Sequence, residues 1–571
     1  MSIKKSKHIK KKTFFFQDYK ESEIGINAKR GNFTKISLNR TAFLFFIFIS
    51  LISIFSFKII YLSLSQEKNY YLLNTDSHFK KERGDIVDRN GVLIARNIDI
   101  YDAAVIPKLV KNKKKLLINL RLSIPEVDIV NVKKKLNKNK YFYIKRRLTE
   151  EEYTKLWLLG NKAIDFPKRQ NRIYPQKNLF SHIIGQIDDN NNGISGVEKF
   201  FDSKLKKDFV NSPLHLTLDS NLQHLIREEL IKAQSYFNNV GSAAILMDVE
   251  NGEILSLVSL PDYDLNKRVS IDKDIFTNKI TKGVYELGSV FKTFTIAAGL
   301  ENNLIDTNTV FKELKNHIFC SGRKISEHDE LPKNLTAEQI LIRSSNIGAV
   351  RIAQKIGIEK YRNFLDSLEL FKKIDFDLDE VGTPLPFRWG KCKLATASFG
   401  HGITTTPLQL ARAYAILGNG GYKIEPSIIK NKKEKKNKQI ISSETSHKIN
   451  SILRKIVSNK EGTANFANVE GFDIGGKTGT ALKSVNGNYT KKKLNTFVSL
   501  FPSHKPKYVF LVILDEPQPA PNFVYEFPNG YKHKGEKRNT SGWNTVVVAG
   551  KIIEKIGPIL AINNLQASNK F

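Results

Sequence analysis

The chain has 571 residues, more than one typical domain contains. It carries 91 Lys or Arg against 57 Asp or Glu, a formal net charge of +34. Such an excess can indicate nucleic-acid binding, but the basic residues are spread along the chain instead of forming one module, so we expect no nucleic-acid partner. A basic surface also suits anionic lipids or cell-wall polymers.

An apolar segment near the N-terminus predicts a membrane anchor. Residues 41–57 contain no charged side chain, and 59–64 continue the apolar character. The first 40 residues carry eleven Lys or Arg against three acidic residues, so we expect a cytoplasmic tail over 1–40, an uncleaved anchor over 41–64 and an exported remainder. A cleaved signal peptide is the alternative, but no small-x-small cleavage site follows the apolar run.

Residues 65–213 show short strand-like pieces and Lys-rich helical stretches, without a constellation of catalytic residues. The charge runs at 111–115 and 133–140 are typical of solvated faces. We therefore predict a non-catalytic pedestal over 65–213. The chain has two cysteines, Cys320 and Cys392, in the part expected outside the membrane, where disulfides form. The sequence leaves open whether the two are close enough to pair.

From residue 214 the pattern becomes α/β, which predicts a catalytic domain over 214–565. We expect helices and strands in this order: helix 220–237, strands 243–248, 253–259, 496–501 and 508–514, and helix 545–560. The expected arrangement is an antiparallel sheet flanked by the first and last helices, with a helical subdomain inserted at about 265–455. Residues 430–438 are predicted to form a polar loop, and 566–571 a loose tail.

The first candidate site is Ser289 followed by Lys292. Gly288 permits a sharp turn and an apolar helix-like run follows, so Ser289 is expected at a helix N-terminus with Lys292 one turn on. A neutral lysine in a partly desolvated pocket can accept the serine proton. A buried helix whose lysine reaches solvent is the purely structural alternative. The pattern Ser-x-x-Lys alone carries little information, because it also occurs at Ser2, Ser65, Ser77, Ser203 and Ser270.

A second candidate pair is Ser344 and Asn346. Residues 336–354 are expected to form a helix that contains both. Two residues apart, their side chains can reach one cleft from a turn or a helix end. Ser344 can then relay a proton, and Asn346 can bind a substrate amide. A capping Ser-Asn pair is the structural alternative.

The third pattern is Lys477-Thr478-Gly479-Thr480, after a glycine-bearing strand. Gly479 allows a ligand to approach the backbone closely. Lys477 and Thr478 can hold a carboxylate. The N–H of Thr480, together with that of Ser289, can form an oxyanion hole.

The same region also matches a bare phosphate-loop pattern. Residues 471–478 read Gly-x-x-x-x-Gly-Lys-Thr, which in another context would cradle phosphates. We reject this interpretation, because no buried parallel strand of an α/β repeat precedes the pattern and no acidic magnesium partner is evident.

The three motifs, in this order, resemble those of the class B penicillin-binding proteins, which are D,D-transpeptidases. Further segments resemble that family, namely 83–91, 172–175, 193–198 and 216–219. Residues 399–403, 406–409 and 514–517 are similar to the septal, FtsI-type branch of the family.

The resemblance implies the serine penicillin-recognising fold and a peptidoglycan D,D-transpeptidase that acts through a serine acyl-enzyme on D-Ala-D-Ala, with an amine acceptor, during septal wall synthesis. It assigns catalysis and substrate binding to Ser289, Lys292, Ser344 and Asn346, and to Lys477, Thr478, Gly479 and Thr480, respectively. It requires no metal or organic cofactor. It implies β-lactam inhibition, a single-pass location in the bacterial inner membrane with a periplasmic catalytic domain, and partnership with a glycosyltransferase and divisome membrane proteins.

Three alternatives stay open. An elongation-type transpeptidase differs in its partner proteins. A D,D-carboxypeptidase or a β-lactamase uses the same motifs with water as acceptor, but the large pedestal and the anchor disfavour both. An inactive wall scaffold is disfavoured by the intact set of motif residues.

Overall fold

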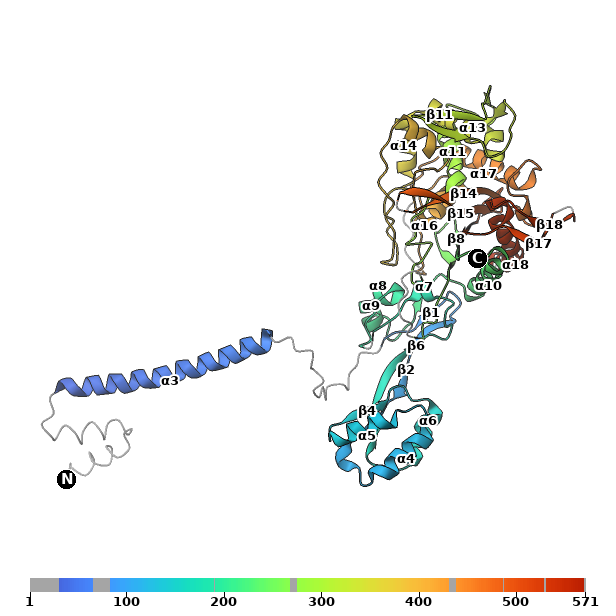
Figure 1. The fold of residues 1–571 in the computed structure, drawn as a ribbon. Coiled ribbons are helices and arrows are strands. Elements are labelled where there is room, and N and C mark those ends of the chain that lie inside the picture. The colour runs from blue at the N-terminus through green and yellow to red at the C-terminus, as the bar shows by residue number, and fades with distance from the viewer. Residues whose placement is uncertain are drawn as a thin grey trace, which may run out of the picture. The chain divides into compact units, whose positions relative to one another are not determined.

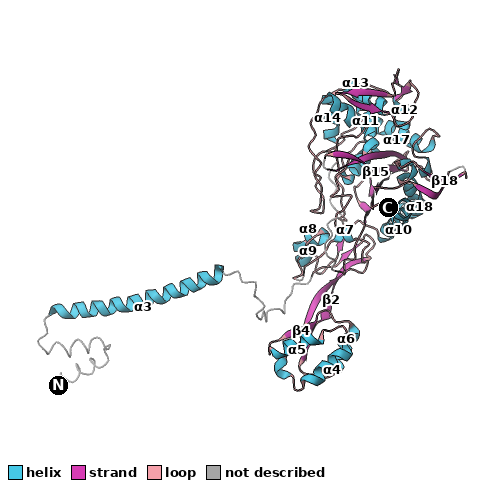
Figure 2. Cartoon of the chain, in the orientation of Figure 1, coloured by secondary structure: helices cyan, strands magenta, loops and turns pink. Residues whose placement is uncertain are grey.

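The computed structural model describes residues 30–64, 83–188, 190–267, 275–430, 438–485, 487–527 and 530–568. The chain divides into two units, residues 1–80 and 81–571, which are described one at a time. The second unit contains both sheets and helices, so the predicted mixed α/β fold class is confirmed (Figure 2). Residues 431–437 of the predicted polar loop lie outside the described part.

The first unit contains one long helix, α3 (Arg30–Leu64), drawn in blue in Figure 1. Its segment Ala42–Tyr61 has 20 residues with a mean hydropathy of 2.5, and none of it is buried inside the protein. At 1.5 Å per residue such a helix covers about 30 Å, the thickness of a bilayer's hydrocarbon core. By length and composition, α3 can therefore cross a membrane.

The second unit begins with a four-stranded sheet in the order β6-β2-β1-β7. Its strands are β1 (Ile86–Val87), β2 (Leu93–Tyr101), β6 (Lys168–Ile173) and β7 (Leu214–His215). Strands β2 and β6 lead into a small cluster with an apolar core of its own (Figure 1). The cluster contains β3 (Ala103–Val105), α4 (Lys113–Ser123), α5 (Ile129–Asn137), β4 (Phe142–Lys145), α6 (Glu150–Leu158) and β5 (Ile164–Asp165), and after β6 come α7 (Ser181–Ile184), α8 (Gly196–Phe200) and α9 (Asp202–Lys207).

A buried ion cluster holds the start of this unit. The two oxygens of Glu198 accept from Arg83 Nε at 2.6 Å and from Arg172 Nε at 2.7 Å, and all three side chains are at most 1% exposed. Arg83 also donates to Asp202 at 2.6 Å. A carboxylate taken out of water is tolerated when its oxygens are paired and hydrogen-bonded. Glu198 therefore ties Arg83, the first described residue of the unit, to α8 and β6.

The sheet of the predicted catalytic domain has five antiparallel strands in the order β14-β15-β16-β8-β9. They are β8 (Gly241–Asp248), β9 (Ile254–Leu260), β14 (Gly475–Val485), β15 (Asn488–Phe501) and β16 (Tyr508–Asp515). Every residue of β8, β9 and β16 is buried, which explains why these strands are mainly apolar and do not alternate between apolar and polar residues. The helices α10 (Ser220–Phe237) and α18 (Thr545–Ser568) pack on each other and on the sheet. The expectation of a loose tail from residue 566 is wrong for 566–568, which continue α18.

The inserted helical part packs around α11 (Lys292–Glu301), which follows the 3₁₀ turn η3 (Gly288–Phe291). Its other elements are β10 (Val310–Phe311), β11 (His317–Cys320), β12 (Arg323–Ser326), β13 (Leu335–Thr336), α12 (Ala337–Ile342), α13 (Asn346–Ile356), α14 (Ile358–Ser367), α15 (Lys391–Ala397), α16 (Pro407–Gly418) and α17 (Ser443–Ser458). Near the C-terminus lie η4 (Asn465–Ala467), β17 (Ala520–Glu526), β18 (Lys532–Glu536) and η5 (Ser541–Trp543).

The expectation of one helix over 336–354 is wrong, because α12 and α13 are separate. Ser344 lies between them with a φ of 60°, a left-handed conformation that no right-handed helix accommodates. The hydroxyl of Ser345 accepts from the N–H of Gly348 at 2.9 Å and so caps α13. Consecutive serines favour such a cap over a helix interior, because their hydroxyls compete for backbone groups.

We expect Glu198→Gln to destabilise the protein by about 3–5 kcal/mol, because it leaves two buried guanidinium groups without their shared carboxylate. The free energy of unfolding is measured by denaturant titration of the purified full chain. The matched control is Glu151→Gln, which removes an exposed ion pair with Lys155 on α6 and should change stability little. Equal effects of the two substitutions would contradict the structural role of Glu198.

Candidate active site

The turn η3, which carries the predicted nucleophile Ser289, is shaped by a glycine. Gly288 has a φ of 65°, and a Cβ placed on it would lie 2.7 Å from the carbonyl oxygen of Thr480. Only glycine fits a backbone of this hand so close to another strand. The N–H of Lys292 then donates to the carbonyl of Ser289, which starts α11 and leaves the Ser289 side chain partly exposed.

The turn abuts β14, the end strand of the five-stranded sheet. A Cβ on Gly479 would lie 2.2 Å from the carbonyl oxygen of Leu287, and one on Gly288 would lie 3.2 Å from the backbone nitrogen of Thr480. The backbones of Ser289 and Thr480 are therefore neighbours at this edge. Two N–H groups there are suited to bind one developing oxyanion.

Ser344 accepts hydrogen bonds from two lysines. Its Oγ lies 3.1 Å from Lys292 Nζ and 3.0 Å from Lys477 Nζ, and its backbone carbonyl also accepts from Lys292. A hydroxyl oxygen has two lone pairs, and the two lysines occupy both lone pairs of Ser344 Oγ. The O–H of Ser344 therefore remains available as a donor. The strained φ of Ser344 presents its carbonyl and its hydroxyl to the same lysine.

Both lysines are fully buried, which disfavours their charged forms. Burial lowers the pKa of Lys292 to about 7, against a smaller opposing effect of the Glu327 carboxylate. Burial, and then the charge of Lys292, hold the pKa of Lys477 well below its usual value. One of these amines can therefore act as a base at neutral pH.

Asn346 begins α13 and presents an acceptor without a partner. Its Nδ2 donates to the carbonyl of Ser326 at 2.8 Å, whereas its buried Oδ1 has no hydrogen bond to a described residue. The N–H of Asn346 donates to Glu327 at 2.7 Å, and Glu327 also accepts from Ser345 Oγ at 2.6 Å and from the N–H of Ile347 at 2.9 Å. A carboxylate at a helix N-terminus is stabilised by these donors and by the helix dipole.

The threonines of β14 are oriented by neighbours outside the motif. The hydroxyl of Thr478 lies 2.9 Å from that of Thr463 and accepts from Lys477 Nζ at 3.4 Å. Thr480 uses its hydroxyl to accept from the N–H of Ser541 at 3.1 Å. All of 475–480 belongs to an antiparallel strand, so the bare phosphate-loop match has no structural counterpart.

The fold thus brings all eight predicted site residues to the junction of η3, the α12–α13 break and β14. Lys292 is predicted to accept the proton of Ser289, but no hydrogen bond joins these two side chains in the described part of the chain. Sequence reasoning missed Glu327 and Thr463. Neither lies in a recognisable motif, since both act across long sequence separations. Among the described residues no group of three His, Cys, Asp or Glu is placed to hold a metal ion.

Two family models match the chain. The penicillin-binding protein transpeptidase domain matches residues 242–533, and the penicillin-binding protein dimerisation domain matches residues 79–207. The chain belongs to the penicillin-binding proteins. Its catalytic domain is a penicillin-binding transpeptidase domain, so the sequence-based prediction of a transpeptidase enzyme is confirmed.

Curated relatives agree with this family. The probable peptidoglycan D,D-transpeptidase FtsI of Caulobacter vibrioides is 30% identical over 84% of this chain and 82% of its own length. The peptidoglycan D,D-transpeptidase FtsI of Buchnera aphidicola is 30% identical over 88% of this chain and 94% of its own length. Stage V sporulation protein D of Bacillus subtilis is 31% identical over 77% of this chain and 75% of its own length.

A solved structure supports the fold alone. A peptidoglycan synthetase from Bifidobacterium adolescentis superposes with a TM-score of 0.64 at 18% identity, covering 84% of this penicillin-binding protein and 96% of that chain. At this identity the match carries the arrangement of elements and no residue role.

We expect acylation by a penicillin to speed up as the pH rises through about 7, because only the neutral amine of Lys292 accepts a proton. In Glu327→Gln the opposing carboxylate charge is gone, so the midpoint should move to lower pH. The rate of covalent labelling by a fluorescent penicillin is measured against pH. Glu330→Gln, on the same loop and exposed, is the control and should keep the wild-type midpoint. An unmoved midpoint in Glu327→Gln would refute the coupling.

Proposed function

We propose that this penicillin-binding protein is a peptidoglycan D,D-transpeptidase that cross-links stem peptides through an acyl-enzyme on Ser289. One observation carries the proposal: two buried lysines converge on Ser344 Oγ, at 3.1 and 3.0 Å, beside the nucleophile turn. This arrangement supplies a neutral base, a proton relay and an anion-binding group to one site, which acyl transfer through serine requires. The names of the Caulobacter and Buchnera relatives support the same reaction.

In the first half-reaction, neutral Lys292 takes the proton of Ser289, and the serine oxygen attacks the carbonyl carbon of a D-Ala-D-Ala bond. The N–H groups of Ser289 and Thr480 stabilise the oxyanion. Ser344 donates a proton to the leaving nitrogen and is reprotonated through the adjacent lysine. The C–N bond breaks, and D-Ala departs with its amine.

The substrate is oriented by groups around this centre. Lys477 and Thr478 bind the terminal carboxylate, whose charge favours the protonated form of Lys477. Thr463 directs the hydroxyl of Thr478. The free Oδ1 of Asn346 accepts from a substrate amide, and Gly479 lets the substrate backbone lie against β14.

In the second half-reaction, the amine of another stem peptide attacks the acyl-enzyme, forms the new amide and releases Ser289. A D,D-carboxypeptidase or a β-lactamase would need an activated water instead. Glu327 is the carboxylate that influences Lys292, but both of its oxygens already accept from the start of α13. That occupancy favours an amine acceptor over water.

We assign the enzyme to septal wall synthesis with a glycosyltransferase and divisome membrane proteins as partners. Its similarity to proteins named FtsI supports this role. Localisation of a fluorescent fusion at division sites tests it, and a fusion distributed along the side wall would favour the elongation-type alternative.

We expect Ser289→Ala to abolish covalent labelling by a fluorescent penicillin, because the ester oxygen is gone. Lys292→Ala should slow labelling by ~10²–10⁴-fold through loss of the base. The matched control is Ser203→Ala on α9, which changes another Ser-x-x-Lys sequence at an exposed position and should label normally. Labelling that persists in Ser289→Ala, located by peptide mapping, would exclude this nucleophile.

We expect Lys477→Ala to slow acylation far more for substrates with a free carboxylate than for an amidated analogue, because the lysine charge acts on that group. Lys477→Arg should not restore the full rate, since guanidinium is larger and directs its donors differently. The acylation rates of the two analogues are compared for each variant. Equal losses for both analogues would assign Lys477 to the proton network alone.

We infer that α3 crosses the inner membrane once with the N-terminus in the cytoplasm, because basic residues precede the apolar segment. Protease added to spheroplasts should digest the chain after about residue 65 and spare an N-terminal tag. A protected catalytic domain would contradict this orientation.

A further inference from the structure

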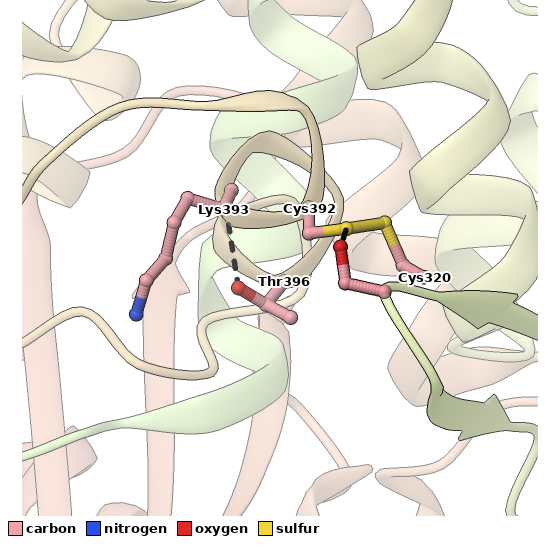
Figure 3. The surroundings of a disulfide bond; sticks show 5 residues. Cys320, Cys392, Lys393 and Thr396 are labelled. Atoms are coloured by element: carbon pink, nitrogen blue, oxygen red, sulfur yellow. Dashed lines mark hydrogen bonds between the residues drawn. A yellow bond between two sulfur atoms is a disulfide. The ribbon is translucent and has the colours of Figure 1, made fainter.

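Cys320 and Cys392, the two cysteines of the chain, form a disulfide with a Cα–Cα distance of 5.6 Å (Figure 3). The bond joins the tip of the β11–β12 hairpin to the first turn of α15. The two cysteines are 72 positions apart, so the bond links two elements that are distant in the sequence. Both cysteines are partly exposed and accessible to a reductant in solution.

The hairpin has few other attachments at this end. β11 and β12 form a two-stranded sheet of their own. Among the eight residues of these strands only Ile325 is buried, and Phe319 is 66% exposed. A two-stranded hairpin is at best marginally stable by itself. The disulfide is therefore a principal restraint on the position of the hairpin.

The opposite end of the hairpin holds the start of α13. The carbonyl of Ser326 accepts from Asn346 Nδ2, and the carboxylate of Glu327 accepts from the N–H groups of Asn346 and Ile347. A displacement of β12 would thus be transmitted to Asn346 and to the break that contains Ser344.

The other partner of the disulfide supports the nucleophile. The carbonyl of Ser398, directly after α15, accepts from Thr295 Oγ1 at 2.7 Å, one turn beyond Lys292 on α11. Two residues later, a Cβ on Gly400 would lie 2.1 Å from the carbonyl oxygen of Gly288. The segment that follows Cys392 is therefore in direct contact with the Ser289 turn.

We propose that the Cys320–Cys392 disulfide positions the acylation site. It fastens the hairpin that holds Asn346 to the helix that supports the Ser289 turn, so the amide-binding and nucleophilic sides keep their separation. Its reduction slows acylation while the domain stays folded. This inference rests on the acylation of Ser289 proposed above.

The first test reduces the folded wild-type chain with a water-soluble phosphine. The phosphine takes up the oxygen of one water and becomes a phosphine oxide, and the two sulfurs become thiols. We expect the rate of fluorescent-penicillin acylation to fall about tenfold or more, as misplacement by about 1 Å can cause. Because the chain has no other cysteine, Cys320→Ala/Cys392→Ala should acylate slowly with or without phosphine. An equal rate for oxidised and reduced wild type would overturn the proposal.

The second test separates positioning from general stability. If the disulfide acts through Glu327 and Asn346, its reduction should slow acylation far less in Glu327→Gln than in wild type, with both proteins assayed above their pH midpoints. The same fold-loss on reduction in both proteins would show independent effects and overturn the proposal, as would unfolding of the reduced chain at the assay temperature. Thermal unfolding is followed on the same samples. If oxidised wild type is not labelled at Ser289 at all, the proposed acylation of Ser289 is refuted. This result differs from those that refute only the role of the disulfide.

Discussion

Two lysine side chains buried around one hydroxyl oxygen cannot both carry a proton at little cost. Lys292 and Lys477 are both withdrawn from water and both donate to Ser344 Oγ, and the charge of Lys292 further disfavours that of Lys477. The neutral amine that the proposed acyl transfer needs is thus a consequence of burial. Glu327 opposes this effect in part, so the amine keeps a pKa near neutrality and does not lose its basicity.

That burial depends on close backbone contacts that only glycine allows. Gly288 and Gly479 bring the nucleophile turn against β14, and Gly400 brings a third segment against the same turn. A side chain at any of these positions would collide with a carbonyl oxygen, so the turn would move away from the strand and water would reach the lysines. The lowered pKa of the lysines therefore depends on the close packing of these backbones.

The residues proposed to carry out acylation come from segments far apart in the chain, and each is held by structure outside its own motif. Ser289 depends on Gly400, Asn346 on Glu327, and Thr478 on Thr463. The disulfide joins the β11–β12 hairpin, which leads to Glu327, to α15, which leads to Gly400 (Figure 3). Such a bond persists in oxidising surroundings, which the proposed periplasmic location would supply.

The sequence by itself determined the mixed α/β class, the apolar segment within α3, the order of the sheet strands along the chain and the eight motif residues. These follow from local periodicity and from short patterns, which act within a few residues. The break between α12 and α13, the disulfide pairing and the roles of Glu327 and Thr463 were decided only by the tertiary structure. Each of them depends on groups that are distant in sequence and adjacent in space, and no local pattern records that adjacency.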